Sequence, residues 1–351
     1  AKPSGTEKMF FADLYSGVEL TGSAGPTCDT TTGVATLVSK IEAGGIGAIL
    51  ITTDPLDEFT TNFLGEMRVL SAVQLADLSN DWEPVSQSII SEQPARAKAT
   101  AQRGETVTVP SASAFDFEVS GNCIEGDNLP DSVDVQYPWE DHPQRKHSRT
   151  LSIPSLVFDK FTVSNDEYSA FLDATGWSPA TDQNFLRHWN DDGSVPEGWG
   201  SKPVIWVSRS DSSAYCSAVG ARLPTSYEWQ YAAQGTDGRR FPWGDKFDKA
   251  KVCEYTSGRE MPAPCDRDAF PEGASPFGLE DMVGNVYQWT DAFEDAHTDR
   301  AVLRGGSRWR AAGSSWYLPQ PSDLREHDTF LMMSDSMDRS AGIGFRCVSD
   351  N

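Results

Sequence analysis

Residues 304–307, Arg-Gly-Gly-Ser, and residues 343–347, Ile-Gly-Phe-Arg-Cys, are the stretches that decide the fold of this chain. Three further motifs precede them: Arg-Leu-Pro-Thr at 222–225, Phe-Pro-Trp-Gly at 241–244 and Val-Gly-Asn-Val-Tyr-Gln-Trp at 283–289. The motifs place glycine or proline, which set turns and helix starts, beside bulky or cationic side chains that can anchor them. They predict a domain built around fixed loops.

The composition of the 351-residue chain is that of a globular protein with one large domain or two ordinary ones. Hydrophobic residues make up 38%, and 11 Trp and 17 Phe supply a sizeable core. The 29 Gly and 21 Pro favour turns and short strands over a helical bundle. No apolar run reaches the roughly 18 residues that a membrane-spanning helix needs.

The formal net charge of −23 would repel nucleic acid and anionic lipid surfaces, so we expect neither as a partner. Residues 145–149, Arg-Lys-His-Ser-Arg, are a local basic stretch that we predict to be a solvated loop. The chain begins at Ala1 without an initiator Met, and we expect a processed protein or a piece of a longer one.

The six cysteines form no Cys-x-x-Cys pair, which argues against zinc and thioredoxin-like chemistry. Their even number is compatible with three disulfides and an oxidising compartment, so we expect a secreted or otherwise extracytoplasmic protein.

Residues 1–91 are predicted to form a small β-rich domain. Residues 34–41 and 46–52 are apolar, β-branched runs around a Glu-Ala-Gly-Gly sequence, which predicts a β-hairpin. Asp54 and Pro55 then mark the start of a helix. Such a hairpin looks like the terminal β-sandwich that follows many glycosidase barrels in longer proteins. Residues 92–105 are small and polar, as in a linker.

Residues 106–351 are predicted to form a second domain of the α+β class. Capping boxes at 164–167 and 225–228 each start a helix, and Gly176 and Gly235 close these helices. Downstream, loops rich in Gly, Pro and Asp link brief strands, so a few helices accompany many loops.

In their order and spacing, the five motifs between 222 and 347 resemble the sulfatase-modifying-factor family, whose founding activity is the formylglycine-generating oxidase. The resemblance runs from about residue 105 to 351 and implies a formylglycine-generating-enzyme-like fold, related to that of C-type lectins. Because Arg304 and Arg346 lie beside glycines, we expect them to hold backbone carbonyls or to pair with buried acids.

The resemblance also implies disulfide partners. Cys216 and Cys347 match cysteine positions of the family, so we expect a bond that would contribute roughly 4–5 kcal/mol to stability. Cys253 and Cys265 are close in sequence and are expected to pair. Cys28 and Cys123 would then tie the two regions together, provided that all six are oxidised.

Family members bind calcium at the segment that matches residues 281–288. Carried over by position, the ligands are the Asp281 side chain, the carbonyls of Gly284 and Val286, and the Gln288 side chain. Hard oxygen donors of this kind suit calcium. Gln288 stands where the family commonly has glutamate, which removes a negative charge, so we expect a weakened calcium site.

Formylglycine formation in this family depends on copper held between two thiolates that follow the Gly-Gly-Ser sequence. By spacing from Ser307, those positions are Arg310 and Ser315 in this chain. Neither side chain binds Cu(I). We therefore expect no copper and no formylglycine formation by the family mechanism.

The resemblance extends to the ergothioneine-type sulfoxide synthases, whose iron is held by histidines of a separate helical domain. This chain has five histidines and no His-x-x-x-His pair. A metal site built from His327 with Asp328 or Asp338 would make the chain an oxidoreductase with an unassigned metal, which is the alternative function. Against it, an isolated histidine is more often a surface or hydrogen-bonded residue than a ligand.

The stretch that lines the family's substrate cleft favours a binding module instead. Aromatic and arginine side chains bind peptides or sugars by stacking and bidentate hydrogen bonds, although Trp309 and Trp316 would fit a tryptophan-rich core equally well. The candidate cleft residues are Ser307, Arg308, Trp309, Arg310, Ser315, Trp316, Tyr317 and His327. We expect an extracytoplasmic ligand-binding or structural module for a peptide, carbohydrate or protein, within a larger assembly or longer chain.

Overall fold

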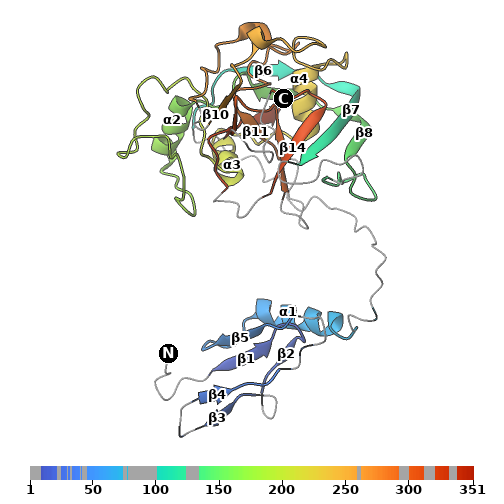
Figure 1. The fold of residues 1–351 in the computed structure, drawn as a ribbon, viewed down its shortest axis with the longest axis vertical. Coiled ribbons are helices and arrows are strands. Elements are labelled where there is room, and N and C mark those ends of the chain that lie inside the picture. The colour runs from blue at the N-terminus through green and yellow to red at the C-terminus, as the bar shows by residue number, and fades with distance from the viewer. Residues whose placement is uncertain are drawn as a thin grey trace. The chain divides into compact units, whose positions relative to one another are not determined.

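Two units, residues 1–83 and residues 84–351, make up the computed structural model of the chain (Figure 1). The structure describes residues 9–21, 25–29, 31, 34–39, 41, 46–73, 77, 101–123, 134–258, 262–291, 300–311, 321–331 and 338–351.

The first unit has short strands and one helix among its described residues. These elements are β1 (Phe10–Asp13), β2 (Val18–Glu19), β3 (Thr27–Asp29), β4 (Val34–Thr36), β5 (Ile49–Thr52) and α1 (Glu58–Leu70). β1 lies between β2 and β5 in an antiparallel sheet, whereas β3 and β4 form a separate two-stranded ribbon.

The hairpin predicted for residues 34–52 is wrong. Both apolar runs contain a strand, but β4 pairs with β3 and β5 pairs with β1. The predicted turn, residues 42–45, lies outside the described residues. A β-branched run indicates that a segment is extended, whereas the choice of its partner depends on packing against distant parts of the chain.

The helix of the first unit begins later than predicted. Its N-cap is Asp57, whose side chain accepts a hydrogen bond from the Thr60 backbone N–H at 2.8 Å, and not Asp54. Both aspartates precede the apolar run. An N-cap side chain accepts a hydrogen bond from a backbone N–H two or three residues later in the chain, and Asp57 does so with Thr60.

The second unit mixes sheets and helices in an α+β arrangement. Its helices are α2 (Asn165–Thr175), α3 (Arg209–Ala218), α4 (Ser226–Gln234) and the 3₁₀ turns Lys249–Lys251 and Pro271–Gly273. Its strands are β6 (Thr106–Val109), β7 (Ala112–Cys123), β8 (Lys146–Ile153), β9 (Leu156–Asp159), β10 (Thr256–Gly258), β11 (Tyr287–Trp289), β12 (Arg300–Arg304), β13 (Trp309–Ala311), β14 (Glu326–Leu331), β15 (Ile343–Gly344) and β16 (Val348–Asp350).

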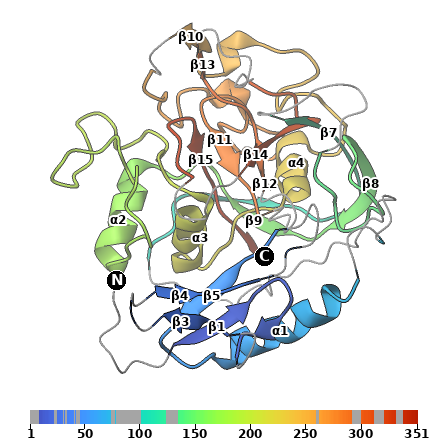
Figure 2. The ribbon, with the colours of Figure 1, turned by 60° about the horizontal axis from the view of Figure 1, so that its bottom comes forward.

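A six-stranded mixed sheet organises this unit, in the order β15-β11-β12-β14-β7-β8. A second, antiparallel sheet has the order β16-β9-β6, and β10 pairs in parallel with β13. Figure 2 shows α2 and α3 side by side and α4 next to β12. Within the described part of the chain, no helix combines the length and the apolar character that crossing a membrane would require.

Both predicted capping boxes are present. Ser164 and Thr225 are the N-caps of α2 and α4, and in each box the side chains and backbone N–H groups bond reciprocally. Gly176 ends α2 with φ of 63°, a left-handed conformation that glycine adopts without a steric penalty. Local sequence patterns therefore predicted the start of both helices and the end of α2.

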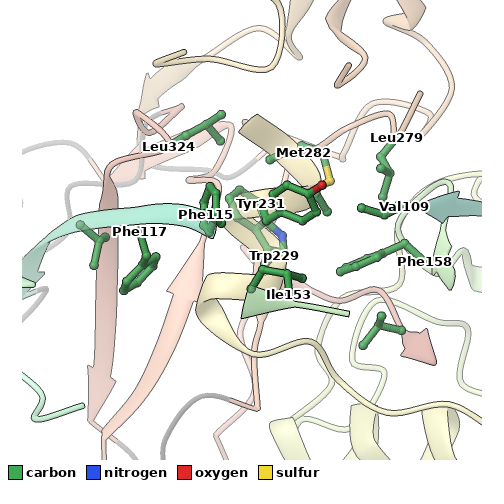
Figure 3. Close-up of a cluster of buried hydrophobic side chains, with 14 of the residues drawn as sticks. Val109, Phe115, Phe117, Ile153, Phe158, Trp229, Tyr231, Leu279, Met282 and Leu324 are labelled. Atoms are coloured by element: carbon green, nitrogen blue, oxygen red, sulfur yellow. The ribbon is translucent and has the colours of Figure 1, made fainter. Parts of the chain in front are cut away.

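Two clusters of buried side chains form the core of the second unit. The first lies against α4, where Trp229 is fully buried among the aromatic side chains of β7, including Phe115 and Phe117 (Figure 3). The second packs Tyr168 of α2 and Tyr215 of α3 against Phe345, with ring centroids of the two tyrosines 5.7 Å apart. Aromatic residues thus supply much of the apolar area that leaves water.

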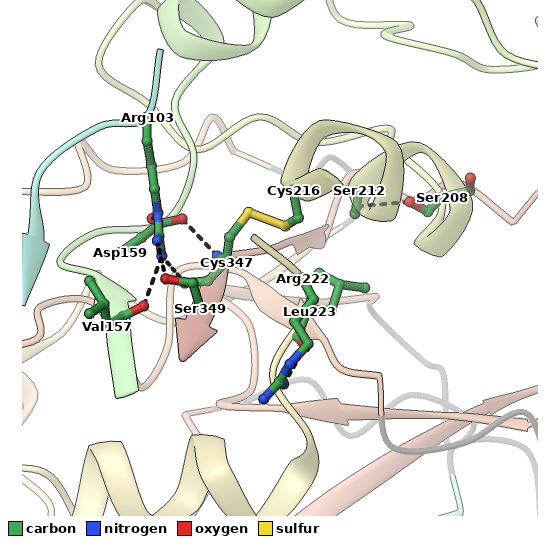
Figure 4. The surroundings of a disulfide bond; sticks show 10 residues. All are labelled: Arg103, Val157, Asp159, Ser208, Ser212, Cys216, Arg222, Leu223, Cys347 and Ser349. Carbon is green, nitrogen blue, oxygen red and sulfur yellow. Dashed lines mark hydrogen bonds and ion pairs between the residues drawn. A yellow bond between two sulfur atoms is a disulfide. The ribbon is translucent and has the colours of Figure 1, made fainter. Parts of the chain in front are cut away.

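A disulfide joins Cys216 of α3 to Cys347, the residue before β16, as the family resemblance implies (Figure 4). Beside it, Arg103 donates from Nε to Asp159 Oδ1 at 2.6 Å and from Nη2 to the carbonyl oxygen of Val157 at 2.9 Å. Arg103 belongs to the stretch with the composition of a linker, so the end of that stretch is packed into the second unit.

The structure also contains the expected Cys253–Cys265 disulfide. The third expected pair, Cys28 with Cys123, cannot be followed, because the side chains of both residues lie outside the described part of the structure.

Candidate functional site

The Arg-Gly-Gly-Ser motif forms the turn after β12 and begins with a buried cation. The Arg304 guanidinium donates to Ser226 Oγ at 3.1 Å, to Gln230 Oε1 at 2.9 Å and to the Leu324 carbonyl oxygen at 2.8 Å. Burial lowers the pKa of Arg304 to about 10, so the side chain stays charged at neutral pH. The bond to Leu324 agrees with the expectation that Arg304 holds backbone carbonyls, whereas its two side-chain partners are a hydroxyl and an amide and not acids.

Arg308, a candidate cleft residue, is also buried and holds loops together. Its guanidinium donates to the carbonyl oxygens of Pro262, Asn285 and Ala341 at 2.9, 3.0 and 3.1 Å. Only 1% of the residue is exposed. Because the side chain is buried, a ligand could contact Arg308 only after the segments that cover it had moved.

The other candidate cleft residues are only partly covered by the structure. Ser307 is buried, and its hydroxyl has no hydrogen-bond partner among the described residues. Trp309 is half-buried on β13, and its indole N–H likewise lacks a partner within the described ranges. The Arg310 side chain and residues 312–320, which include Ser315, Trp316 and Tyr317, lie outside those ranges.

The Val-Gly-Asn segment, where calcium was expected, is held by hydrogen bonds. Gln288 Oε1 accepts from Trp229 Nε1 at 2.9 Å and from Arg346 Nε at 2.7 Å, and Gln288 Nε2 donates to the Asp281 carbonyl oxygen at 2.9 Å. The Asp281 carboxylate accepts from Asn285 Nδ2 at 3.0 Å. Burial raises the pKa of Asp281 to about 7, although part of the residue reaches the surface.

These bonds leave Gln288 Oε1 without a free lone pair, so calcium could use this atom only by displacing two N–H donors. We therefore expect the dissociation constant for calcium to be no lower than about 1 mM, the weak end of the range for protein sites. Thermal unfolding measured across calcium concentrations tests this, with Asp281→Asn as the matched variant. If micromolar calcium raised the unfolding temperature of the wild type but not that of Asp281→Asn, the expectation would be contradicted.

His327 of β14 lies in a buried polar cluster that the sequence did not reveal. Its Nε2 contacts Asp134 Oδ2, and His147 Nε2 lies 3.4 Å from the same oxygen. The side chains of both histidines are fully buried, and that of Asp134 is 3% exposed. Among the described residues, this is the one group of three or more His, Cys, Asp or Glu side chains with the spacing of metal ligands.

The outer nitrogen of each histidine also has a partner. His147 Nδ1 lies 2.9 and 3.1 Å from the two oxygens of Glu140, and His327 Nδ1 lies 3.3 Å from the Tyr137 hydroxyl. The Tyr137 hydroxyl in turn donates to Ser226 Oγ at 3.2 Å, and Ser226 also accepts from Arg304. The cluster is thereby linked to the Arg-Gly-Gly-Ser motif.

The electrostatics of the cluster favour a carboxylate between the two rings. Although burial opposes it, the charges and hydrogen bonds of His327 and His147 lower the pKa of Asp134 well below its usual value. Burial lowers the pKa of His327, whereas hydrogen bonds to Asp134 and Glu140 outweigh burial and raise that of His147. Asp134 is therefore ionised at neutral pH.

Two sequence interpretations are corrected by this cluster. Residues 145–149 are not a solvated loop, because Lys146–Ile153 form β8 and His147 faces the interior. The partners of His327 are Asp134 and His147, and neither Asp328 nor Asp338 belongs to the group. Successive residues of a strand point to opposite faces of a sheet, so Asp328 does not share the face of His327.

Comparisons with known proteins agree with the motif analysis. Residues 98–351 match the family model of the sulfatase-modifying factor enzyme 1-like domain. The inactive C-alpha-formylglycine-generating enzyme 2 of Mus musculus is 29% identical over 272 residues, which cover 65% of this chain and 83% of that protein. The hercynine oxygenase of Mycolicibacterium smegmatis is 30% identical over 209 residues, covering 47% of this chain and 48% of the oxygenase.

Among solved structures, PvdO from Pseudomonas aeruginosa is similar with a TM-score of 0.47 and 20% identity, covering 70% of this chain and 94% of that one. The family assignment does not depend on this structural likeness, because the family model already spans well over half of the sequence. The chain therefore belongs to the sulfatase-modifying-factor family.

Proposed function

We propose that the chain is a member of its family that does not generate formylglycine and acts as an extracytoplasmic ligand-binding or structural module. One feature of the sequence carries the proposal: counted from Ser307, Arg310 and Ser315 stand where the resemblance to the family implies the two copper-binding thiolates. The similarity to a mouse protein named as inactive supports it.

Two further features support a binding or structural role outside the cytoplasm. The two disulfides persist in oxidising compartments and are rare in the cytosol. Trp309 is half-buried on β13, and the part of its side chain that reaches the surface suits stacking on a ligand. A C-type-lectin-like ancestry of the fold would fit such a role.

The catalytic part of the proposal is tested with a cysteine-containing sulfatase peptide, copper and oxygen, followed by mass spectrometry of the peptide. We expect no conversion of the cysteine to the aldehyde, and the mouse formylglycine-generating enzyme serves as the positive control. Conversion by this chain, abolished on removal of copper, would overturn the proposal.

The binding part is tested with peptide and glycan arrays probed with the folded chain. We expect a ligand whose binding weakens at least about tenfold in Trp309→Ala, the usual effect of losing an aromatic anchor. Trp243→Ala is the control, because the Trp243 indole already donates to the Lys246 carbonyl oxygen. An equal loss of ligand affinity in the two variants would show that Trp309 is not part of the binding site.

A metal-dependent oxidoreductase is the second candidate, favoured by the buried cluster of Asp134, His147 and His327. Two histidines and one carboxylate are a ligand set that non-haem iron enzymes use. The similarity to hercynine oxygenase covers about half of that enzyme, so it does not by itself assign the oxygenase activity to this chain. Stoichiometric iron in the purified protein, measured by mass spectrometry, would favour this candidate, whereas protein free of redox metals would remove it.

A further inference from the structure

Three lone-pair donors converge in the interior of the second unit. Both imidazole Nε2 atoms are directed at one oxygen of Asp134, and all three ligand atoms lie within 4.8 Å of one another. The His147 Nε2 to Asp134 Oδ2 distance is 3.4 Å.

The fold brings these residues together by strand pairing. β7 lies between β14 and β8, with His327 opposite Gly121 and His147 opposite Val119. Gly121 and Val119 are two residues apart, so both histidines share one face of the sheet. A Cβ on Gly121 would lie 1.9 Å from Asp134 Oδ2, so the absence of a side chain at 121 makes room for the carboxylate.

The outer contacts fix how the two rings are oriented. His147 Nδ1 lies 2.9 Å from Glu140 Oε1, and His327 Nδ1 lies 3.3 Å from the Tyr137 hydroxyl. With its proton on Nδ1, each neutral ring has a lone pair on Nε2 that is directed at the Asp134 carboxylate.

Without a metal ion, protons on Nε2 would donate to the Asp134 carboxylate, with the ring centroids 5.6 Å apart in a buried site. One divalent ion in place of these protons would bind all three ligand atoms. Asp134 Oδ1, which has no hydrogen-bond partner among the described residues, is a further oxygen available to that ion.

We propose that Asp134, His147 and His327 bind one divalent transition-metal ion, with Glu140 and Tyr137 orienting the two imidazole ligands. Imidazole nitrogens select zinc, iron or cobalt over calcium and magnesium, and three protein ligands leave a position for water. A carboxylate behind a ligating histidine is a frequent companion of such sites. The proposal concerns binding and holds whether the chain is a binding module or an enzyme.

Isothermal titration of the full chain with Zn²⁺ tests the site, and the absorption spectrum of bound Co²⁺ reports its coordination. We expect one equivalent to bind, with affinity reduced at least about 100-fold in His327→Gln and in His147→Gln. Glu140→Gln removes only the orienting carboxylate and should cost about 10–100-fold. His142→Gln is the matched control, because His142 is exposed and lies outside the group.

Gly121→Ala separates ligand geometry from ligand identity. It keeps all three ligands but forces the Asp134 carboxylate to move, so zinc affinity should fall without any change in the metal-binding residues. Equal zinc affinity in the wild type and His327→Gln would overturn the proposal, as would the absence of saturable binding to folded wild-type protein. Should the histidine variants fail to fold, X-ray absorption of the zinc-loaded wild type decides, and fewer than two imidazole ligands would reject the site.

Discussion

Replacing Arg346 by methionine is expected to lower the free energy of unfolding of the second unit by about 3–5 kcal/mol. The Arg346 guanidinium is fully buried and makes five hydrogen bonds: to Gln288 Oε1 and to the carbonyl oxygens of Asp159, Lys160, Glu280 and Asp281. Methionine fills similar space but donates nothing, so each of these buried acceptors would lose a donor. Gln288 Oε1 and the carbonyl oxygens of Asp281 and Lys160 would each keep one other donor.

Urea unfolding followed by tryptophan fluorescence measures this effect, since ten of the eleven tryptophans belong to residues 84–351. Arg240→Met is the matched control. The Arg240 side chain is 57% exposed and pairs with Asp323 at 2.5 Å, so its loss should leave the urea midpoint nearly unchanged. Similar midpoints for Arg346→Met and the wild type would show that the network around residue 288 is not a main support of the fold.

Removing the Cys216–Cys347 disulfide is expected to cost about 5 kcal/mol, because it closes a loop with a sequence separation of 131. Replacing both cysteines by serine releases that constraint on the unfolded chain. The Cys253–Cys265 bond, with a separation of 12, provides the comparison and should cost only about 3 kcal/mol.

Both double variants are compared with the wild type under non-reducing conditions, again by urea unfolding. The informative result is which double variant loses more free energy of unfolding. That order is expected from the lengths of the two loops, since both variants remove the same chemical bond. A larger loss for the Cys253–Cys265 variant would mean that native contacts around each bond, and not chain entropy, dominate its contribution.

Local features of the sequence predicted local features of the fold. Capping boxes at Ser164 and Thr225 act within one turn of helix, so the residues that decide them are adjacent. The hairpin of residues 34–52 was wrong because its strands took partners elsewhere, which short-range patterns do not encode. Asp57 was missed as a cap because Asp54-Pro55 carries the same signal three residues earlier.

The candidate site was predictable only in part. His327 was identified, but its companions come from β8 and from the segment before it, and strand pairing through β7 unites them. A hint was present: His147 begins an alternating stretch in which Leu151 and Ile153 also face inward. The neighbouring basic residues Arg145, Lys146 and Arg149 favoured the interpretation of this segment as a solvent-exposed loop.

The position of β7 also constrains how the protein can fold. Its neighbour β8 follows closely in sequence, whereas its other neighbour, β14, lies more than half the chain away. During synthesis, β7 and β8 can pair early, but the second edge of β7 stays open until nearly the whole chain has emerged. The edge of β7 that β14 covers is residues 120–123, and an unpaired strand edge is a template for aggregation, so folding yield should depend on how soon β14 arrives and on what shields that edge before then.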